Sequence, residues 1–283
     1  MLERIVVGYD GSRQARAAYD TALMLAKAAR TPLEAVYVHE PGVAEMLSVS
    51  PAMALDPLAP PAMPPPLVTE VELEPPKEIL NDLEAFKHEC HLSGVPFTSH
   101  IARGTLVDYL VRHSRVGDLL AIGLTGRFAT SGLGSTARAL TTQAPCPVLV
   151  ANQLIGPVNR VMTVFDSTAP AAAALAFSLD LGRQTGWPVT VLAMARGDTT
   201  LEQSLARAQS LAPDSLILPL GDDRGDRGDA WQAQLIDQAV ESDRFALLVM
   251  GAYADSALKD LLLGSRTGHV LAKLGGAAIL VHA

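Results

Sequence analysis

The amino-acid sequence repeats itself. The first 40 residues of the 283-residue chain align without a gap with a segment that lies 156 positions further on. The matched pairs are acidic, hydroxyl-bearing, small or apolar in both copies: Asp10 with Asp166, Ser12 with Thr168, Ala15 with Ala171, Ala18 with Ala174, Leu23 with Leu179, Leu25 with Leu181, Pro32 with Pro188 and Val38 with Met194. Self-similarity of this kind predicts two copies of one domain. We expect the first copy to span residues 1–152 and the second to span residues 158–283.

The repeated segment predicts a strand, a helix and a second strand. An apolar run over residues 5–7 leads into Asp10-Gly11-Ser12, which is typical of a turn and a helix start. Alanines at helical spacing continue to about residue 30, and Pro32 separates them from an apolar run over residues 33–38. Two strands joined through a helix imply a parallel sheet with a right-handed crossover. Each copy is therefore expected to be an α/β domain.

The remaining elements follow from the same patterns. In the first copy we expect helices over residues 77–92, 104–113 and 135–142, and strands over residues 95–102, 119–122 and 145–151. In the second copy we expect strands over residues 161–165, 189–194, 216–220, 245–250 and 277–282. Pro145 and Pro147 bound the last strand of the first copy. Because proline cannot donate to a β-ladder, this strand is expected at an edge.

One segment of the first copy has no counterpart in the second. Residues 41–76 are rich in proline, contain Met46, Met53 and Met63, and follow no steady hydrophobic period. This composition predicts an inserted loop. Two interpretations stay open, a tolerated surface insertion and a lid or partner-docking segment. The second copy carries a polar, glycine- and aspartate-rich loop at residues 221–229.

Glycines follow the fourth predicted strand of each copy. Glycine lets backbone amides approach a phosphate closely, and a helix N-terminus favours negative charge. Ligands of such sheets lie beyond the carboxyl ends of the strands. We therefore expect the aspartates to accept hydrogen bonds from ribose or adenine, the backbone at the end of the second strand to meet the adenine edge, and the glycine loops to hold phosphates. The candidate binding residues are Asp10, Val38, Gly123, Gly126, Gly134, Ser135 and Thr136 in the first copy and Asp166, Met194, Gly251, Gly264 and Ser265 in the second.

Simpler interpretations of these residues stay open. Asp10 is also a plausible helix N-cap, and each glycine is also compatible with a plain turn. Arg127 and Arg138 near the first loop, and Arg266 near the second, are either phosphate-neutralising or ordinary surface charges.

The chain resembles the universal stress protein family, and specifically its tandem two-domain members. The resemblance rests on residues 5–12, on the strand end at residues 36–41, on the glycine loops and on residues 146–150. It implies an α/β fold of two tandem doubly wound, Rossmann-like domains, each with a five-stranded parallel sheet. It also implies an internal pseudo-dimer that pairs the last strands, residues 148–151 and 277–282. The family's role is in the stress response, and its binding members hold ATP or another adenine nucleotide, usually with a divalent metal such as Mg²⁺.

Each copy departs once from the ATP-binding pattern of that family, in which nine residues separate a Gly-x-x-Gly pair from Gly-Ser/Thr. The first copy has Gly123 and Gly126, but seven residues precede Gly134. The second has nine residues before Gly264, but Ala254 replaces the middle glycine. The first copy is the favoured nucleotide site, because Asp10, Gly123, Gly126 and Gly134 are all present there.

Composition and missing motifs narrow the function classes. The net charge of −8 argues against a nucleic-acid surface, and no apolar run is long enough to span a membrane. The start of the chain has no signal-peptide pattern, so a cytoplasmic protein is expected. There is neither a P-loop nor a Gly-x-Ser-x-Gly elbow, and His88, Cys90 and His91 lack metal-ligand spacing. We expect a binding protein without robust catalysis. The open alternatives are a nucleotide-free interaction module that uses the insertion and a slow ATP hydrolase, and a homodimer and an unknown protein partner stay open as well.

Overall fold

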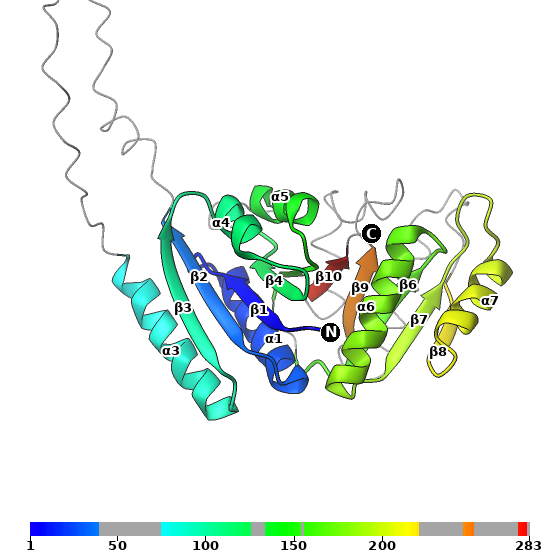
Figure 1. Ribbon diagram of the computed structural model, residues 1–283, viewed down its shortest axis with the longest axis horizontal. Coiled ribbons are helices and arrows are strands. Elements are labelled where there is room, and N and C mark those ends of the chain that lie inside the picture. The colour runs from blue at the N-terminus through cyan, green and yellow to red at the C-terminus, as the bar shows by residue number, and fades with distance from the viewer. Residues whose placement is uncertain (40–74, 126–133, 154–155, 221–245, 252–276, 282–283) are drawn as a thin grey trace, which may run out of the picture.

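The computed structural model describes residues 1–39, 75–125, 134–153, 156–220, 246–251 and 277–281 (Figure 1). These residues form one ten-stranded sheet in the order β3-β2-β1-β4-β5-β10-β9-β6-β7-β8. Five parallel strands come from each half of the chain, and the two halves repeat one strand order. The fold is therefore the expected α/β arrangement of two Rossmann-like sheets.

The first half supplies the strands and helices up to residue 151. Its strands are β1 (Arg4–Gly8), β2 (Leu33–His39), β3 (Phe97–Arg103), β4 (Asp118–Gly123) and β5 (Val148–Ala151). Its helices are α1 (Arg13–Ala29), α3 (Lys77–Ser93), α4 (Leu106–His113) and α5 (Ser135–Gln143). These elements were predicted to within about two residues at their ends, except that β5 begins three residues later than expected, after both prolines.

The second half repeats the pattern from residue 160. Its strands are β6 (Arg160–Phe165), β7 (Val189–Ala193), β8 (Leu216–Pro219), β9 (Ala246–Gly251) and β10 (Ala277–Val281). Its described helices are α6 (Ala169–Thr185) and α7 (Leu201–Leu211). No prediction was made for α7, although Thr200 and Gln203 form a capping box at its start, a signal that the sequence does contain.

The halves join through their last strands. β5 and β10 pair antiparallel, with Ala151 opposite Ala277 and Val148 opposite Leu280. Figure 1 shows β10, in red, in the middle of the sheet, with α3 and α7 towards its two ends. The expected internal pseudo-dimer is confirmed. The expectation that β5 is an edge strand is confirmed for its own half, and its outer side pairs with β10 of the other half; Pro145 and Pro147 precede the strand and remove no ladder hydrogen bond.

Alternating strand residues feed two apolar layers. One layer packs β-strand side chains such as Val6, Leu120 and Val150 against α4 and α5 and continues into the second half through Met162 and Leu248. The layer on the opposite face packs against α1, α3 and α6 and also crosses the seam. Because both layers run through β5 and β10, the core does not divide at the boundary between the halves.

A polar contact on the helical side also ties the halves together. Gln184 of α6 accepts a hydrogen bond from the backbone nitrogen of Leu2 at 2.9 Å. Its amide donates to the carbonyl oxygens of Leu2 at 2.8 Å and Ala29 at 3.1 Å, and lies 3.3 Å from Thr31 Oγ1. One side chain thus satisfies backbone groups before β1 and at the end of α1.

Most of the insertion at residues 41–76 lies outside the described residues; Pro76, at its end, is the N-cap residue of α3. The proposed boundaries at residues 152 and 158 stay predictions. Within the described part of the chain, no helix is long and apolar enough to cross a membrane.

Candidate functional site

The candidate site lies where the chain path reverses direction across the first half of the sheet. From β1 the chain passes to β2 and β3 on one side, and then to β4 and β5 on the other. The connections that leave the carboxyl ends of β1 and β4 therefore run to opposite sides, and this is the position at which open parallel sheets bind their ligands. Asp10 follows β1, and Gly134 follows β4.

Asp10 has one oxygen committed to the fold. Its Oδ1 accepts a hydrogen bond from the backbone nitrogen of Ser12 at 2.9 Å. Ser12 in turn accepts from the nitrogen of Ala15 at 3.1 Å and is the N-cap of α1, so the N-cap interpretation of Asp10 is wrong by two residues. Asp10 Oδ2 has no hydrogen-bond partner among the residues that the structure describes. The half-buried carboxylate thus builds the turn with one oxygen and leaves the other as an acceptor.

Gly123 has a packing role that its place in a glycine loop did not reveal. A Cβ at this position would lie 2.8 Å from Gln14 Cβ and 2.9 Å from the backbone nitrogen of Ala15. Gly251 repeats this at the end of β9, where a Cβ would lie 2.5 Å from the carbonyl carbon of Pro170. Both glycines therefore let a strand end approach the first turn of a helix, which accounts for them without a ligand.

The start of α5 is the candidate phosphate site of the first half. Gly134 is the N-cap residue, and with no side chain it makes no cap hydrogen bond. Its nitrogen donates to the carbonyl oxygen of Leu124 at 2.8 Å, which fixes the helix start beside the end of β4. Ser135 is exposed and Thr136 half-buried. The first amides of a helix without a side-chain cap favour an anion. Gly126 lies outside the described residues.

Two neighbouring residues support the Asp10 turn. Val38 is 8% exposed and its side chain belongs to the core, so its backbone alone is available to a ligand. Tyr9 was missed by the sequence reasoning: its nitrogen donates to the carbonyl oxygen of Val36 at 2.8 Å and its hydroxyl to Asp82 of α3 at 2.6 Å. Burial, and then the bond to Asp82, raises the pKa of Tyr9. Tyr9 is therefore a neutral donor that anchors the turn to α3.

The second half uses both oxygens of the equivalent aspartate. Asp166 Oδ1 accepts from the backbone nitrogen of Thr168 at 3.1 Å and from its hydroxyl at 2.5 Å. Asp166 Oδ2 accepts from Arg196 Nη1 at 2.7 Å. The side chains of Asp166 and Arg196 are 5% and 14% exposed. Arg196 was not predicted; the sequence signal was a mismatch in the repeat, since the equivalent residue of the first half is Glu40.

The other predicted residues of the second half add little to a binding site. Met194 is 2% exposed and lies in the core, and its nitrogen donates to the carbonyl oxygen of Phe165 at 2.9 Å. Ser167, between Asp166 and Thr168, takes a left-handed conformation with φ 65° where the first half has Gly11 with φ 79°. Gly264 and Ser265 lie outside the described residues.

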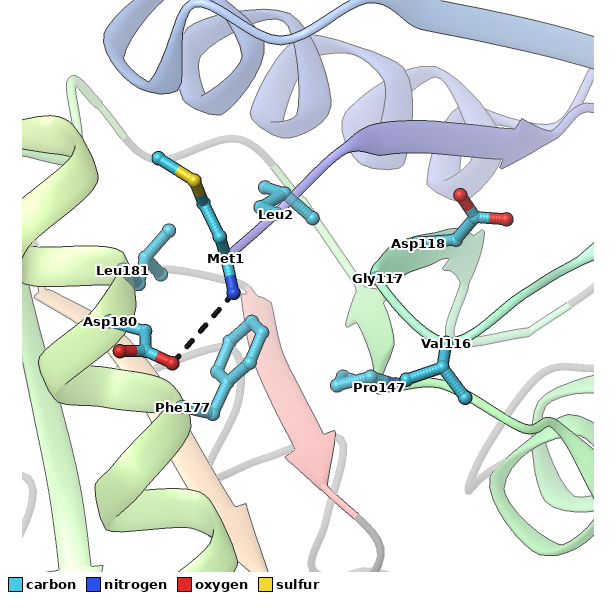
Figure 2. A pocket seen from close by; sticks show the side chains of 9 residues that line it. All are labelled: Met1, Leu2, Val116, Gly117, Asp118, Pro147, Phe177, Asp180 and Leu181. Atoms are coloured by element: carbon cyan, nitrogen blue, oxygen red, sulfur yellow. Dashed lines mark ion pairs between the residues drawn. The ribbon is translucent and has the colours of Figure 1, made fainter.

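A cavity of about 170 Å³ lies where the two halves meet, before the amino ends of β1, β4 and β5 (Figure 2). Its walls include the apolar side chains of Phe177 and Leu181, and its charged groups are the carboxylates of Asp118 and Asp180 and the amino group of Met1. Asp180 lies 3.8 Å from the amino group of Met1, and both oxygens of Asp118 accept from Arg4. Because the Met1 amino group is already paired with Asp180, these lining residues offer a phosphate no unpaired positive charge, and we do not assign a nucleotide to this cavity.

The described residues contain no group of three or more His, Cys, Asp or Glu side chains that could hold a metal ion. His88 and His91 are exposed, whereas Cys90 is buried beside the Tyr19 hydroxyl at 3.5 Å, so these residues of α3 do not converge. Burial raises the pKa of Cys90 and raises that of Cys146 to about 11. Both thiols are therefore protonated near neutral pH, and the thiolate is the form that ligates metals.

Two solved structures of low sequence identity share this fold. A universal stress protein from Archaeoglobus fulgidus is 12% identical, with 99% of this chain and 96% of that chain covered and a TM-score of 0.59. A functionally unknown protein from Pseudomonas aeruginosa is 13% identical, with 99% and 92% covered and a TM-score of 0.56. A universal stress protein family protein from Arabidopsis thaliana, solved with AMP bound, matches about half of the chain: it is 17% identical, with 53% and 92% covered and a TM-score of 0.32.

Sequence comparison identifies the family. A search of curated proteins found no significant match. The family model of the universal stress protein family matches residues 1–152, more than half of the 283 residues. The chain therefore belongs to the universal stress protein family.

Proposed function

We propose that the first half of this protein binds an adenine nucleotide, with ATP as the expected ligand, at the crevice between the ends of β1 and β4. The observation that carries the proposal is the Asp10 carboxylate. Its Oδ1 is held by the Ser12 nitrogen at 2.9 Å, while Oδ2 has no partner in the described part of the chain. The fixed turn preorganises an acceptor beyond the carboxyl end of β1, where open parallel sheets bind their ligands.

The surrounding groups suit the remaining parts of such a ligand. Asp10 Oδ2 would accept a hydrogen bond from a ribose hydroxyl or from the adenine amino group. The backbone near Val38 would meet the adenine edge, because the Val38 side chain is committed to the core. The amides at Gly134, Ser135 and Thr136 would receive phosphate oxygens, since no side chain caps this helix. Mg²⁺, when present, would neutralise phosphate charge.

Isothermal titration with ATP and Mg²⁺ tests the proposal. Asp10→Asn is the sharpest variant, because the amide oxygen can still accept from Ser12 while the amide nitrogen replaces the free acceptor. A hydrogen bond to a charged group is worth about 1.5–3 kcal/mol, so the affinity should fall roughly 10- to 100-fold. Circular dichroism should show an unchanged fold.

Asp166→Asn provides the matched control in the other half and should leave nucleotide affinity unchanged. Wild-type protein that takes up no ATP at high micromolar concentration, or Asp10→Asn that binds as tightly as wild type, would contradict the proposal. We further propose binding without robust catalysis, in a stress-response role. A phosphate-release assay on the ATP-loaded protein tests this part, and turnover at ordinary enzymatic rates would refute it.

A further inference from the structure

The two halves treat one repeated aspartate differently. In the first half, one oxygen of Asp10 is bound by the chain and the other has no partner among the described residues. In the second half, Thr168 donates to one oxygen of Asp166 and Arg196 to the other. Arg196 Nη1 thus donates to Oδ2 of Asp166, the atom that corresponds to the Asp10 oxygen without a partner in the described part of the chain.

The backbone holds Arg196 in place. The nitrogen of Arg196 donates to the carbonyl oxygen of Thr199 at 3.1 Å, and the nitrogen of Thr199 donates to the carbonyl oxygen of Arg196 at 2.9 Å. Gly197 provides the positive φ of 55° inside this turn. Thr200 then caps α7, which begins at Leu201. The guanidinium is therefore delivered to Asp166 from a short, fixed loop.

The pair is costly to open. The side chains of Asp166 and Arg196 are 5% and 14% exposed. A ligand that displaced Arg196 would break a buried ion pair and would itself have to compensate the buried charge of Asp166. The first half cannot form the same pair, because the equivalent residue is Glu40, which has the same charge as Asp10. One charge reversal in the repeat thus separates the two halves.

We infer that Arg196 is a built-in occupant of the second carboxylate site, so that the chain binds one nucleotide, in its first half, and keeps its second half closed. This inference rests on the proposed function for the ligand class. Removing the guanidinium should open the second site to the same nucleotide, with Asp166 as its acceptor.

The experiment counts ATP·Mg²⁺ sites by titration calorimetry and native mass spectrometry of the full chain. Wild type should bind one equivalent, and Asp10→Asn should weaken it at least 10-fold. The double variant Asp10→Asn with Arg196→Met should again bind about one equivalent of ATP·Mg²⁺. Methionine keeps the apolar part of the Arg196 side chain and removes its guanidinium. A further Asp166→Asn change should remove that equivalent again. Arg196→Lys, which can still pair with Asp166, is the matched control and should not open the site.

The outcomes separate the two proposals. Two equivalents on wild type, or no Asp166-dependent site after Arg196→Met, overturn the closed second half whatever the first half does. Loss of the wild-type equivalent in Asp10→Asn supports the first-half site independently. If Arg196→Met does not fold, Arg196→Ala with added guanidinium tests the inference instead. A few millimolar guanidinium should raise the melting temperature of Arg196→Ala but not that of wild type. Equal effects of guanidinium and NaCl on this variant would overturn the inference.

Discussion

Replacing Gly123 by alanine tests whether this glycine serves packing. The residue ends β4 directly against the first turn of α1. Its added Cβ would lie 2.8 Å from Gln14 Cβ, 2.9 Å from the Ala15 nitrogen and 3.0 Å from the Gln14 carbonyl carbon. Two of these atoms are backbone, so no rotamer change can make room. The helix start would have to shift, and with it the hydrogen bond from Ala15 to the Ser12 hydroxyl.

The size of the effect follows from overpacking. An extra methyl group in a well-packed site costs about 1–3 kcal/mol, and a backbone obstacle places Gly123→Ala near the upper figure. For proteins of about 150–250 residues, 1 kcal/mol corresponds to roughly 2–4 °C in melting temperature. Circular dichroism at increasing temperature should therefore show a decrease of about 6 °C or more.

Gly8→Ala is the matched control. Its Cβ would lie 3.2 Å from atoms of Ile122, Leu106 and Leu110, and all three are methyl ends that can move. We expect a decrease of less than half that of Gly123→Ala. Gly251→Ala should behave like Gly123→Ala, because its Cβ would lie 2.5 Å from the Pro170 backbone. A Gly123→Ala variant that melts within about 1 °C of wild type would refute the packing argument and return this glycine to a ligand-binding role.

Two further predictions concern helix ends and the seam. Arg30 ends α1 in a left-handed conformation with φ 53°, and Gly186 ends α6 in the same conformation with φ 75°. Arg30→Gly should therefore stabilise the protein by about 1 kcal/mol, and Gly186→Arg should destabilise it by a similar amount. Urea unfolding measures both changes, and midpoints equal to that of wild type would contradict the prediction. Gln184→Glu should destabilise the protein increasingly as pH rises, because the new carboxylate would face the carbonyl oxygens of Leu2 and Ala29. These oxygens would raise the pKa of the glutamate in the folded state. Stability should therefore be lost as pH rises above the pKa of glutamate in the unfolded chain, about 4.3. A stability difference from wild type that does not change with pH would show that the donated bonds of Gln184 carry no weight.

The repeat made most of the fold predictable. Two βαβ units with the same polar punctuation required two similar parallel sheets, and the family resemblance placed their last strands together, as the β5–β10 pairing confirms. The proline-bounded strand β5 is the edge of its own half, as predicted. Val148–Ala151 follow the prolines and pair with β4 on one side and with β10 on the other.

The site was less predictable because glycine and arginine are ambiguous in sequence. A glycine after a strand indicates that a side chain does not fit, but it does not say whether a phosphate or a helix excludes it. At Gly123 the excluding group is α1. Arg196 follows β7 in a region of weak repeat similarity, and its contact with Asp166 depends on a four-residue turn that no hydrophobic pattern records.

The same aspartate can therefore be required by the fold without being part of a binding site. In both halves its Oδ1 accepts a backbone hydrogen bond two residues ahead, from Ser12 or from Thr168, and this bond shapes the turn that begins α1 or α6. The repeated turn alone would retain an aspartate at both positions even if neither half bound a nucleotide. The discriminating atom is Oδ2, which Arg196 occupies in the second half and which has no described partner in the first. A binding assignment from the Asp-x-Ser/Thr pattern should hence depend on what contacts the second oxygen, and in this chain that criterion selects Asp10.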